Sequence, residues 1–250
     1  MKKQQKKTIR LIMSTWPFKI LVKYTTRGRV DRFFEGMESI YNLCSQPEHM
    51  RVLITCDLDD KIMCNDEVKN RIEGYKHAHV IYGTSTGKIN AINRDMDILP
   101  DDFKDWDIIA NFSDDQRFTI FGWDDLIRTD FNSVFPETLD GYMAYLDTDT
   151  QGALSTLLIA GRKFMDLFGF IYNPVYISLF ADNEMEDIAR MMGKFHYTGY
   201  TIYQHLLPAY GHLPEDEMWR IQQDIGWNTD SILYYERKSR NFDIDLLSLK

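Results

Sequence analysis

Two adjacent carboxylates stand directly after a short apolar segment in the middle of the chain. Residues 108–112 are mostly apolar and include β-branched side chains, which predicts a buried strand, and Ser113, Asp114 and Asp115 follow it. Neighbouring carboxylates at the end of a buried strand repel each other and lose hydration, so a positive group usually stands beside them. Mg²⁺ or Mn²⁺ shared with a phosphate group would supply that charge, since both ions prefer oxygen ligands. The alternative is a solvated Asp-Asp pair that caps the next helix.

The carboxylate pair needs a sheet to position it, and the first half of the chain predicts one. The predicted strands are residues 18–24, 51–56, 77–82 and 108–112, and the predicted helices between them are residues 30–44, 65–75 and 89–96. This alternation predicts an α/β fold with a mostly parallel central sheet and helices on both faces. Ligands of such sheets bind beyond the carboxyl ends of the strands, where residues 25–29, Asp57, Lys88 and Asp115 all fall.

The second half of the chain alternates less regularly. Its predicted helices are residues 124–131, 162–168 and 183–193, with two more at the end of the chain, and its predicted strands are residues 141–146 and 154–160, with a β-rich run at 197–205. No linker separates the two halves. We therefore expect a single domain over residues 16–250, preceded by a mobile basic tail of residues 1–15.

Composition limits the class of protein. The 250 residues can bury one good core, and the formal net charge of −9 argues against a general nucleic-acid binder. Three cysteines make no disulfide framework and fit a reducing compartment, so we expect a cytoplasmic location. No apolar run approaches the length of a membrane span, and the apolar segment after the basic tail is too short for a signal peptide. The tail could make a peripheral contact with an anionic membrane, although we favour a solvated tail.

Taken in order, these segments resemble glycosyltransferases of the GT-A fold (the nucleotide-diphospho-sugar transferase fold), in particular the large family 2 type. The resemblance covers about residues 18–215. It rests on the first loop (Tyr24 to Arg29), Asp57, Gly87-Lys88 followed by Asn93, Ser113-Asp114-Asp115, and the late acidic segment Asp182-Asn183-Glu184. Two positions depart from the family pattern. Ser113 stands where the Asp-any-Asp metal motif usually begins, and Ala181 stands where the late motif usually has a glutamate.

The resemblance implies a metal site that holds the diphosphate of a nucleotide sugar. Asp115 is the firmest candidate ligand for Mn²⁺ or Mg²⁺ and Asp114 is the next. A histidine in the position of His205 resembles a third metal or phosphate contact, and its alternative is a structural role. The segment Asp57-Leu58-Asp59 competes as the metal motif, but the family places that function after the fourth strand.

Other residues would frame the nucleotide, which the resemblance assigns to residues 16–120. Asp57 resembles the family residue that accepts a hydrogen bond from the N–H of uracil, a role that suits an acceptor-only carboxylate. Thr25 and Arg27 lie in the first loop, where the alternative for Arg27 is plain surface charge. Lys88 can pair with phosphate, and Asn93 follows it, with a packed polar side chain as the alternative.

The resemblance also implies a general base, contributed by the acceptor-binding half of the chain, residues 121–250. Asp182 is the first candidate and Glu184 the second, because displacement at an anomeric carbon requires the acceptor hydroxyl to lose its proton as it attacks. Carboxylates near the sugar would also stabilise its oxocarbenium-like charge. The alternative is that residues 182–184 only cap a helix over residues 186–193.

The activity implied is that of a metal-dependent glycosyltransferase. It would move a sugar from a nucleotide-diphosphate donor, expected to be a UDP-sugar, to a glycan or other hydroxyl acceptor with inversion. One alternative is a nucleotidyltransferase of related topology, but such enzymes would show a Gly-rich phosphate loop, and residues 25–29 contain one glycine. The other is a non-catalytic nucleotide- or carbohydrate-binding domain, and the presence of Asp115 and of late carboxylates counts against it.

Overall fold

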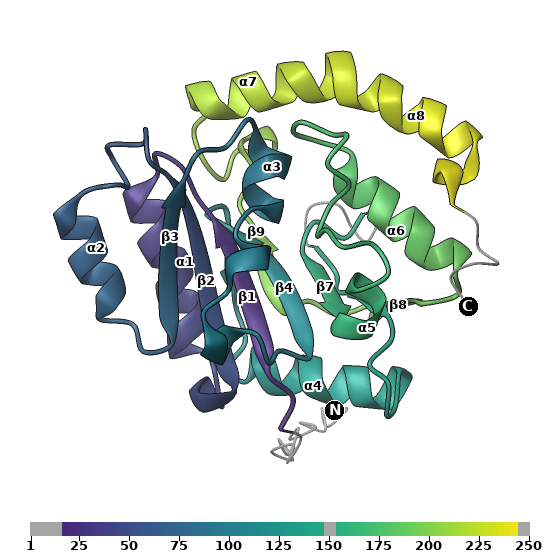
Figure 1. The fold of residues 1–250 in the computed structure, drawn as a ribbon, viewed down its shortest axis with the longest axis horizontal. Helices are drawn as coiled ribbons and strands as arrows, with labels where there is room; N and C mark the ends of the chain where they lie inside the picture. The colour runs from purple at the N-terminus through teal and green to yellow at the C-terminus, as the bar shows by residue number, and fades with distance from the viewer. Residues whose placement is uncertain (1–16, 148–153, 245–250) are drawn as a thin grey trace, which may run out of the picture.

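A seven-stranded sheet forms the centre of the computed structural model, which describes residues 17–147 and 154–244 (Figure 1). Its strands, in the order β3-β2-β1-β4-β7-β6-β8, are β1 (Ile20–Thr25), β2 (Met50–Asp57), β3 (Ala78–Gly83), β4 (Ile108–Ser113), β6 (Tyr142–Ala144), β7 (Leu158–Gly161) and β8 (Phe195–Tyr197). Strands β1 to β4 are parallel, whereas β7 runs antiparallel to both β4 and β6. The predicted α/β fold with a mostly parallel sheet is confirmed. The predicted basic tail lies outside the described residues.

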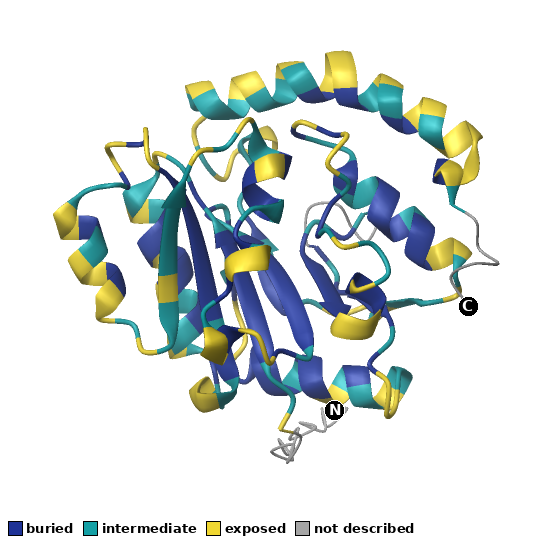
Figure 2. Cartoon of the chain, in the orientation of Figure 1, coloured by how far each residue is buried: buried dark blue, intermediate teal, exposed yellow. Residues whose placement is uncertain are grey.

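Helices cover both faces of this sheet, as predicted (Figure 1). They are α1 (Val30–Asn42), α2 (Asp66–Glu73), α3 (Lys88–Asn93), α4 (Trp123–Val134), α5 (Arg162–Met165), α6 (Ala181–Met191), α7 (Glu217–Ile225) and α8 (Ser231–Ser239). Side chains of α1, α2 and α4 pack in one apolar cluster with Val22 and Tyr24, and those of α3, α5 and α6 pack in a second cluster with Leu21. Successive strand residues point to opposite faces, so β1 contributes to both clusters. The central strands are accordingly buried along their length (Figure 2).

The β-rich run predicted at residues 197–205 is interrupted. It divides between β8 and a separate strand, β9 (Tyr203–His205), and Gly199, with a φ of +75°, lies in the turn between them. Strand β9 pairs antiparallel with β5 (Gln116–Phe118) in a small second sheet. Because β5 begins directly after Asp115, this pairing carries a late segment of the chain to the predicted acidic pair.

The two predicted C-terminal helices, α7 and α8, form one long curved helix across the end of the main sheet (Figure 1). A π-helical segment, Gly226–Asp230, joins them. The buried carboxylate of Asp230 accepts backbone N–H bonds of 3.1, 2.7 and 2.8 Å from residues 177–179, which fastens this helix to the preceding loop. None of the described helices, this long one included, has the length and apolarity needed to cross a membrane.

Gly161, at the end of β7, is required by a close approach of two backbone segments. A Cβ atom at this position would lie 1.5 Å from the carbonyl oxygen of Leu139, so Gly161→Ala must displace backbone rather than a flexible side chain. We expect the variant to lose about 3 kcal/mol of unfolding free energy, measured by urea denaturation. Gly74→Ala is the matched control. Gly74 is exposed, has a helical φ of −68°, and should change stability by less than about 0.5 kcal/mol.

Candidate active site

The loop that follows β1 connects acidic groups at the ends of two neighbouring strands. Thr26 Oγ1 donates to Asp114 Oδ2 at 3.0 Å, and the guanidinium of Arg29 donates to Asp114 Oδ1 at 2.8 Å. The adjacent Arg27 donates to Asp57 Oδ2 at 2.6 Å. Strand β1 lies between β2 and β4 in the sheet, so its loop emerges between Asp57 and Asp114. The sheet order therefore brings these two predicted site residues to one place.

The small β5–β9 sheet brings His205 to Asp115. In the register of this pair Gln116 stands opposite His205, and the backbone N–H of Leu206 donates to the carbonyl of Asp115 at 2.7 Å. His205 Nε2 then lies 3.4 Å from Asp115 Oδ2, while its Nδ1 lies 3.4 Å from Oδ2 of the fully buried Asp147. The imidazole is thus held between two carboxylates.

The surroundings of the two adjacent aspartates shift their pKa values in opposite directions. Burial acts to raise the pKa of Asp115, but His205 and Lys88 outweigh it and hold the pKa well below its usual range. Burial and the charge of Asp115 together raise the pKa of Asp114, against the opposing effect of Arg29. Burial alone would lower the pKa of His205, but Asp115 and Asp147 raise it to about 9. Asp115 is therefore the more strongly ionised member of the pair.

The donor set around Asp115 fits a divalent cation that is shared with a substrate. Asp115 supplies carboxylate oxygen, whereas both oxygens of Asp114 face Thr26 and Arg29. His205 supplies an imidazole nitrogen only in its neutral form, so a bound cation must displace the proton that Asp115 and Asp147 stabilise on the ring. Within residues 17–147 and 154–244, no group of three or more His, Cys, Asp and Glu side chains stands ready to hold a metal by itself. Mg²⁺ and Mn²⁺ commonly take only one or two protein carboxylates and complete their coordination with substrate phosphates and water. The site suits that arrangement.

Asp57 and Asp59 already have a positive partner. Arg27 contacts Asp57 at 2.6 Å and spans both oxygens of Asp59 at 2.8 and 2.9 Å. Asp57 also accepts from the Ser85 hydroxyl at 2.6 Å and from Arg94 at 3.1 Å. Since arginine supplies the compensating charge here, the competing metal motif at residues 57–59 is less well supported than the pair at the end of β4.

The remaining nucleotide-side residues are placed less uniformly. Lys88 begins α3, and its charge acts on both Asp115 and Asp182, so it stands within electrostatic reach of each. The Thr25 hydroxyl is buried and has no hydrogen-bond partner among the described residues. Asn93 donates to the Tyr172 carbonyl at 2.6 Å and accepts from the backbone N–H groups of residues 171–172. The contacts of Asn93 are therefore those of an anchor for the segment before α6.

The two candidate bases, Asp182 and Glu184, have different surroundings. Glu184 is buried and accepts from Asn173 and Tyr176, both at 2.7 Å, and from Arg237 of α8 at 2.8 and 3.0 Å. Half-buried Asp182 accepts a local backbone bond of 3.0 Å from the N–H of Asn183, and burial raises its pKa despite the nearby charge of Lys88. Helix α6 begins at Ala181, so the alternative that residues 182–184 cap a helix starting at residue 186 is wrong.

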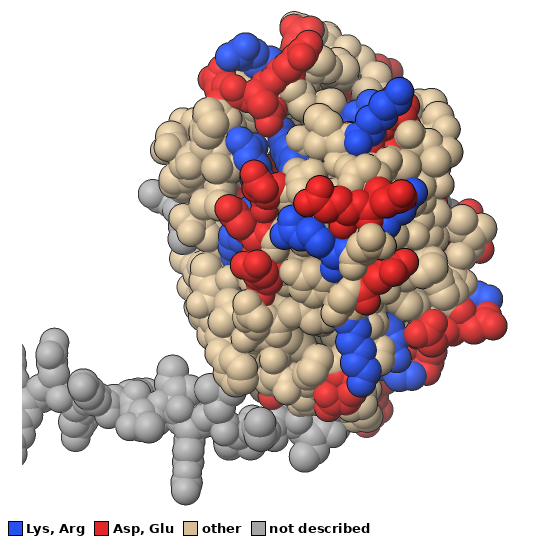
Figure 3. All heavy atoms as spheres, turned by 90° about the vertical axis from the view of Figure 1, so that its left-hand side faces the viewer, with Lys and Arg blue, Asp and Glu red and all other residues tan. Residues whose placement is uncertain are grey.

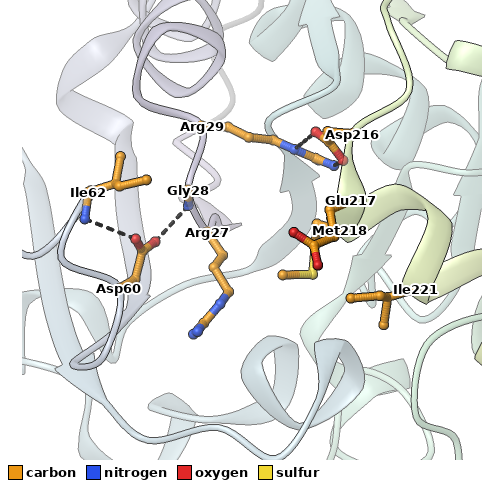
Figure 4. A pocket seen from close by; sticks show the side chains of 9 residues that line it. All are labelled: Arg27, Gly28, Arg29, Asp60, Ile62, Asp216, Glu217, Met218 and Ile221. Atoms are coloured by element: carbon orange, nitrogen blue, oxygen red, sulfur yellow. Dashed lines mark hydrogen bonds and ion pairs between the residues drawn. The ribbon is translucent and has the colours of Figure 1, made fainter.

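Sequence reasoning missed the link between the acidic pair and the C-terminal helix. Arg29, which holds Asp114, also forms two bonds of 2.7 and 2.8 Å to Asp216, and Asp216 caps α7 by accepting from the Trp219 N–H at 2.8 Å. A pocket of about 440 Å³ lies between the first loop and α7 (Figure 4); its lining residues are Arg27, Gly28, Arg29, Asp60, Ile62, Asp216, Glu217, Met218 and Ile221. A charged residue before a predicted helix was the available signal for Asp216. Nothing in the sequence pointed to its partner Arg29, 187 positions away.

Charges of both signs are interspersed on the face that includes α2 and the edge strand β3. Figure 3 shows Lys and Arg side chains next to Asp and Glu side chains there, with no broad surface of one sign. A nucleic-acid backbone is bound through extended positive surfaces. This face therefore has no extended positive surface of the kind that binds a nucleic-acid backbone.

Several solved structures share this architecture at low sequence identity. The mannosyltransferase PcManGT from Pyrobaculum calidifontis, in complex with GDP-Man and Mn²⁺, has a TM-score of 0.63 at 13% identity, covering 84% of this chain and 61% of that chain. S. aureus TarS 1–349 has a TM-score of 0.56 at 11% identity, covering 83% and 69%. TarS 1–349 in complex with UDP has a TM-score of 0.58 at 11% identity, covering 91% and 73%.

These comparisons identify the fold. No protein-family model and no curated protein sequence matches the chain. The chain spans about three fifths of the mannosyltransferase, since it covers 61% of that structure. The strand order and the likeness to these structures together show that the chain has the GT-A fold, as the sequence resemblance implied.

Proposed function

We propose that this chain is a metal-dependent glycosyltransferase that moves a sugar from a nucleoside diphosphate, expected to be UDP, to a hydroxyl acceptor. One observation carries the proposal. The loop after β1 contacts Asp57 and Asp114, and the charge of Lys88 acts on Asp115 and Asp182, so the residues proposed for the nucleobase, the diphosphate and the acceptor are linked by direct contacts or lie within electrostatic reach of one another. The GT-A fold supports this reading, because PcManGT, a mannosyltransferase, has a similar structure.

The diphosphate would lie beside Asp115. Asp115 and His205 would hold Mn²⁺ or Mg²⁺, with Asp114 next to them and braced by Arg29. When bound, the ion would offset the negative charge that grows on the departing phosphate. Lys88, whose charge already acts on Asp115, would add a second positive group for the phosphate oxygens. Asp57 and Arg27, which belong to the first half of the chain, would bind the nucleobase.

The transfer itself would use Asp182 as the general base. Its carboxylate would accept the proton of the acceptor hydroxyl while that oxygen forms a bond to the anomeric carbon. The bond between the anomeric carbon and the phosphate oxygen would break at the same time, releasing the nucleoside diphosphate. A single displacement of this kind inverts the anomeric configuration. Glu184 is less suited, because Arg237, Tyr176 and Asn173 already occupy its oxygens.

Nucleotide binding that depends on metal is the direct test. We expect UDP with Mn²⁺ to raise the thermal midpoint of the protein, since a ligand at 100 times its Kd adds about 2.7 kcal/mol of apparent stability. UDP with EDTA should give a much smaller shift, and UDP-sugars incubated with the protein and Mn²⁺ should release UDP. If no nucleoside diphosphate shifts the midpoint with either metal, the proposal fails. Tighter binding of nucleoside triphosphates with release of pyrophosphate would instead favour a nucleotidyltransferase.

A further inference from the structure

The carboxylate of Asp57 is held more completely on one oxygen than on the other. Oδ1 accepts two hydrogen bonds, from the Ser85 hydroxyl at 2.6 Å and from the Arg94 guanidinium at 3.1 Å. Among the residues that the structure describes, Oδ2 accepts one, from Arg27 at 2.6 Å. A carboxylate offers about four acceptor positions, two on each oxygen. Oδ1 is therefore saturated, and Oδ2 keeps one position for a ligand.

Arg94 is built into this place by the surrounding backbone. A Cβ atom at Gly83 would lie 2.9 Å from Cζ of Arg94, so the guanidinium can occupy this position because residue 83 has no side chain. The guanidinium also donates to the carbonyl of Cys56 at 2.7 Å and contacts Ser85 Oγ at 2.9 Å. It thereby ties the ends of β2 and β3 together beneath Asp57.

The residue after Arg94 fixes the direction of its side chain. Asp95 has a φ of +76°, a left-handed conformation that is unusual for a residue other than glycine. Its buried carboxylate accepts from Thr55 Oγ1 at 2.6 Å and from Arg94 Nε at 3.1 Å. The fully buried Lys23 donates to the Thr55 hydroxyl and to the Arg94 carbonyl, the latter at 3.0 Å. Lys23, Thr55 and Asp95 thus form a buried hydrogen-bond network that fixes the position of Arg94.

The nucleobases differ in how many hydrogen-bond donors their pairing edges present to a carboxylate. The imide edge of uracil has a single donor, N3–H, between two carbonyl acceptors. It needs one free carboxylate position, which Oδ2 provides. Guanine presents two adjacent donors, N1–H and N2–H, and needs both carboxylate oxygens. Cytosine has an acceptor at N3, which would face the carboxylate without a proton between them.

We infer that Ser85 and Arg94 are specificity-determining residues: by saturating Oδ1 of Asp57 they select uracil and reject guanine. The inference rests on the proposed function, in which Asp57 binds the donor base. A guanine bound here would leave one buried N–H without an acceptor, which weakens binding by about tenfold or more. Ser85 acts on the base through Asp57 and is therefore a positioning residue.

Binding of UDP, GDP and CDP to the full chain with Mn²⁺, measured by isothermal titration calorimetry, tests this inference. The wild type should bind UDP about tenfold or more tightly than GDP, and CDP should bind weakly. Ser85→Ala frees one position on Oδ1, so GDP should gain about tenfold while UDP changes little. Thr84→Ala is the matched control, since Thr84 is the exposed neighbour of Ser85 and its hydroxyl is not a partner of Oδ1.

The outcomes separate this inference from the function on which it rests. The proposed base selectivity is overturned if the wild type binds UDP and GDP with equal affinity, or if Ser85→Ala leaves the ratio of their Kd values unchanged. Neither result contradicts the proposed glycosyltransferase function. If Ser85→Ala weakens the binding of UDP and GDP by the same factor, Ser85 has a purely structural role, and the base selectivity is overturned as well. Arg94→Lys keeps the positive charge but replaces the planar guanidinium by a single ammonium nitrogen. It should likewise reduce the difference in affinity between UDP and GDP. If no nucleoside diphosphate binds to the wild type, the proposed function fails and the inference with it.

Discussion

Asp115→Asn should lower the rate of sugar transfer by about a thousandfold, with Mn²⁺-dependent binding of UDP lost in parallel. The side chain keeps its size, but asparagine has no negative charge for a cation. In the structure Asp115 is strongly ionised because His205 and Lys88 stabilise its charge against the cost of burial. Removing that charge leaves His205 and Lys88 without the carboxylate on which both act. The rate is measured as release of UDP from a UDP-sugar, and UDP binding is measured by calorimetry with and without Mn²⁺.

A surface variant provides the comparison for Asp115→Asn. Asp101→Asn makes the same chemical change at an exposed residue whose carboxylate pairs with Lys104, so it should leave the transfer rate and its metal dependence unchanged. A second check is the thermal midpoint of Asp115→Asn without ligand, which should show that the variant is folded. A folded Asp115→Asn protein that retains Mn²⁺-dependent UDP binding would remove Asp115 from the metal site.

The fold and one side of the site could be predicted because both depend on local patterns. Apolar runs of strand length alternate with helical spacing up to residue 112, and parallel strands connected by helices must end at the same edge. Polar residues placed directly after those runs, such as Asp57 and Asp114, are then brought together by the sheet. The loop after β1 confirms this convergence, since it contacts both residues.

The other side of the site depends on contacts that no local pattern encodes. His205 reaches Asp115 only because β9 pairs with β5 rather than extending the main sheet. Arg29 pairs with Asp216, which is far from it in the sequence. Asp147, the second carboxylate beside His205, lies in the half of the chain where the strand–helix alternation is irregular. Pairings between distant segments are decided by tertiary packing, which short-range periodicity does not report.

The choice between the two candidate bases shows how one helix boundary can decide a role. The sequence placed the start of the helix near residue 183, whereas α6 begins at Ala181, so both carboxylates lie within its first turn. Residues two positions apart on a helix point about 200° apart around its axis. Glu184 therefore faces Arg237 of α8, while Asp182 faces the side on which the charge of Lys88 is felt.

Asp182→Asn should reduce kcat by about a hundredfold to ten-thousandfold while leaving the Kd for UDP with Mn²⁺ unchanged. The variant removes the group that would accept the proton of the acceptor hydroxyl, and that group takes no part in holding the nucleotide. Burial raises the pKa of Asp182, so the wild-type rate should fall as pH drops through that raised pKa, because the base must be unprotonated to act. This acidic limb of the rate profile should disappear in Asp182→Asn.

Glu184→Gln separates a catalytic role at Asp182 from a structural role at its neighbour. Glu184 is 2% exposed and pairs with Arg237, so neutralising it leaves a guanidinium without its buried partner and should cost about 3 kcal/mol of unfolding free energy. The folded fraction of Glu184→Gln should retain the acidic limb of the rate profile, because Asp182 remains. If instead Glu184→Gln loses that limb and Asp182→Asn keeps it, the proton acceptor is Glu184, and the ion pair with Arg237 must open during turnover.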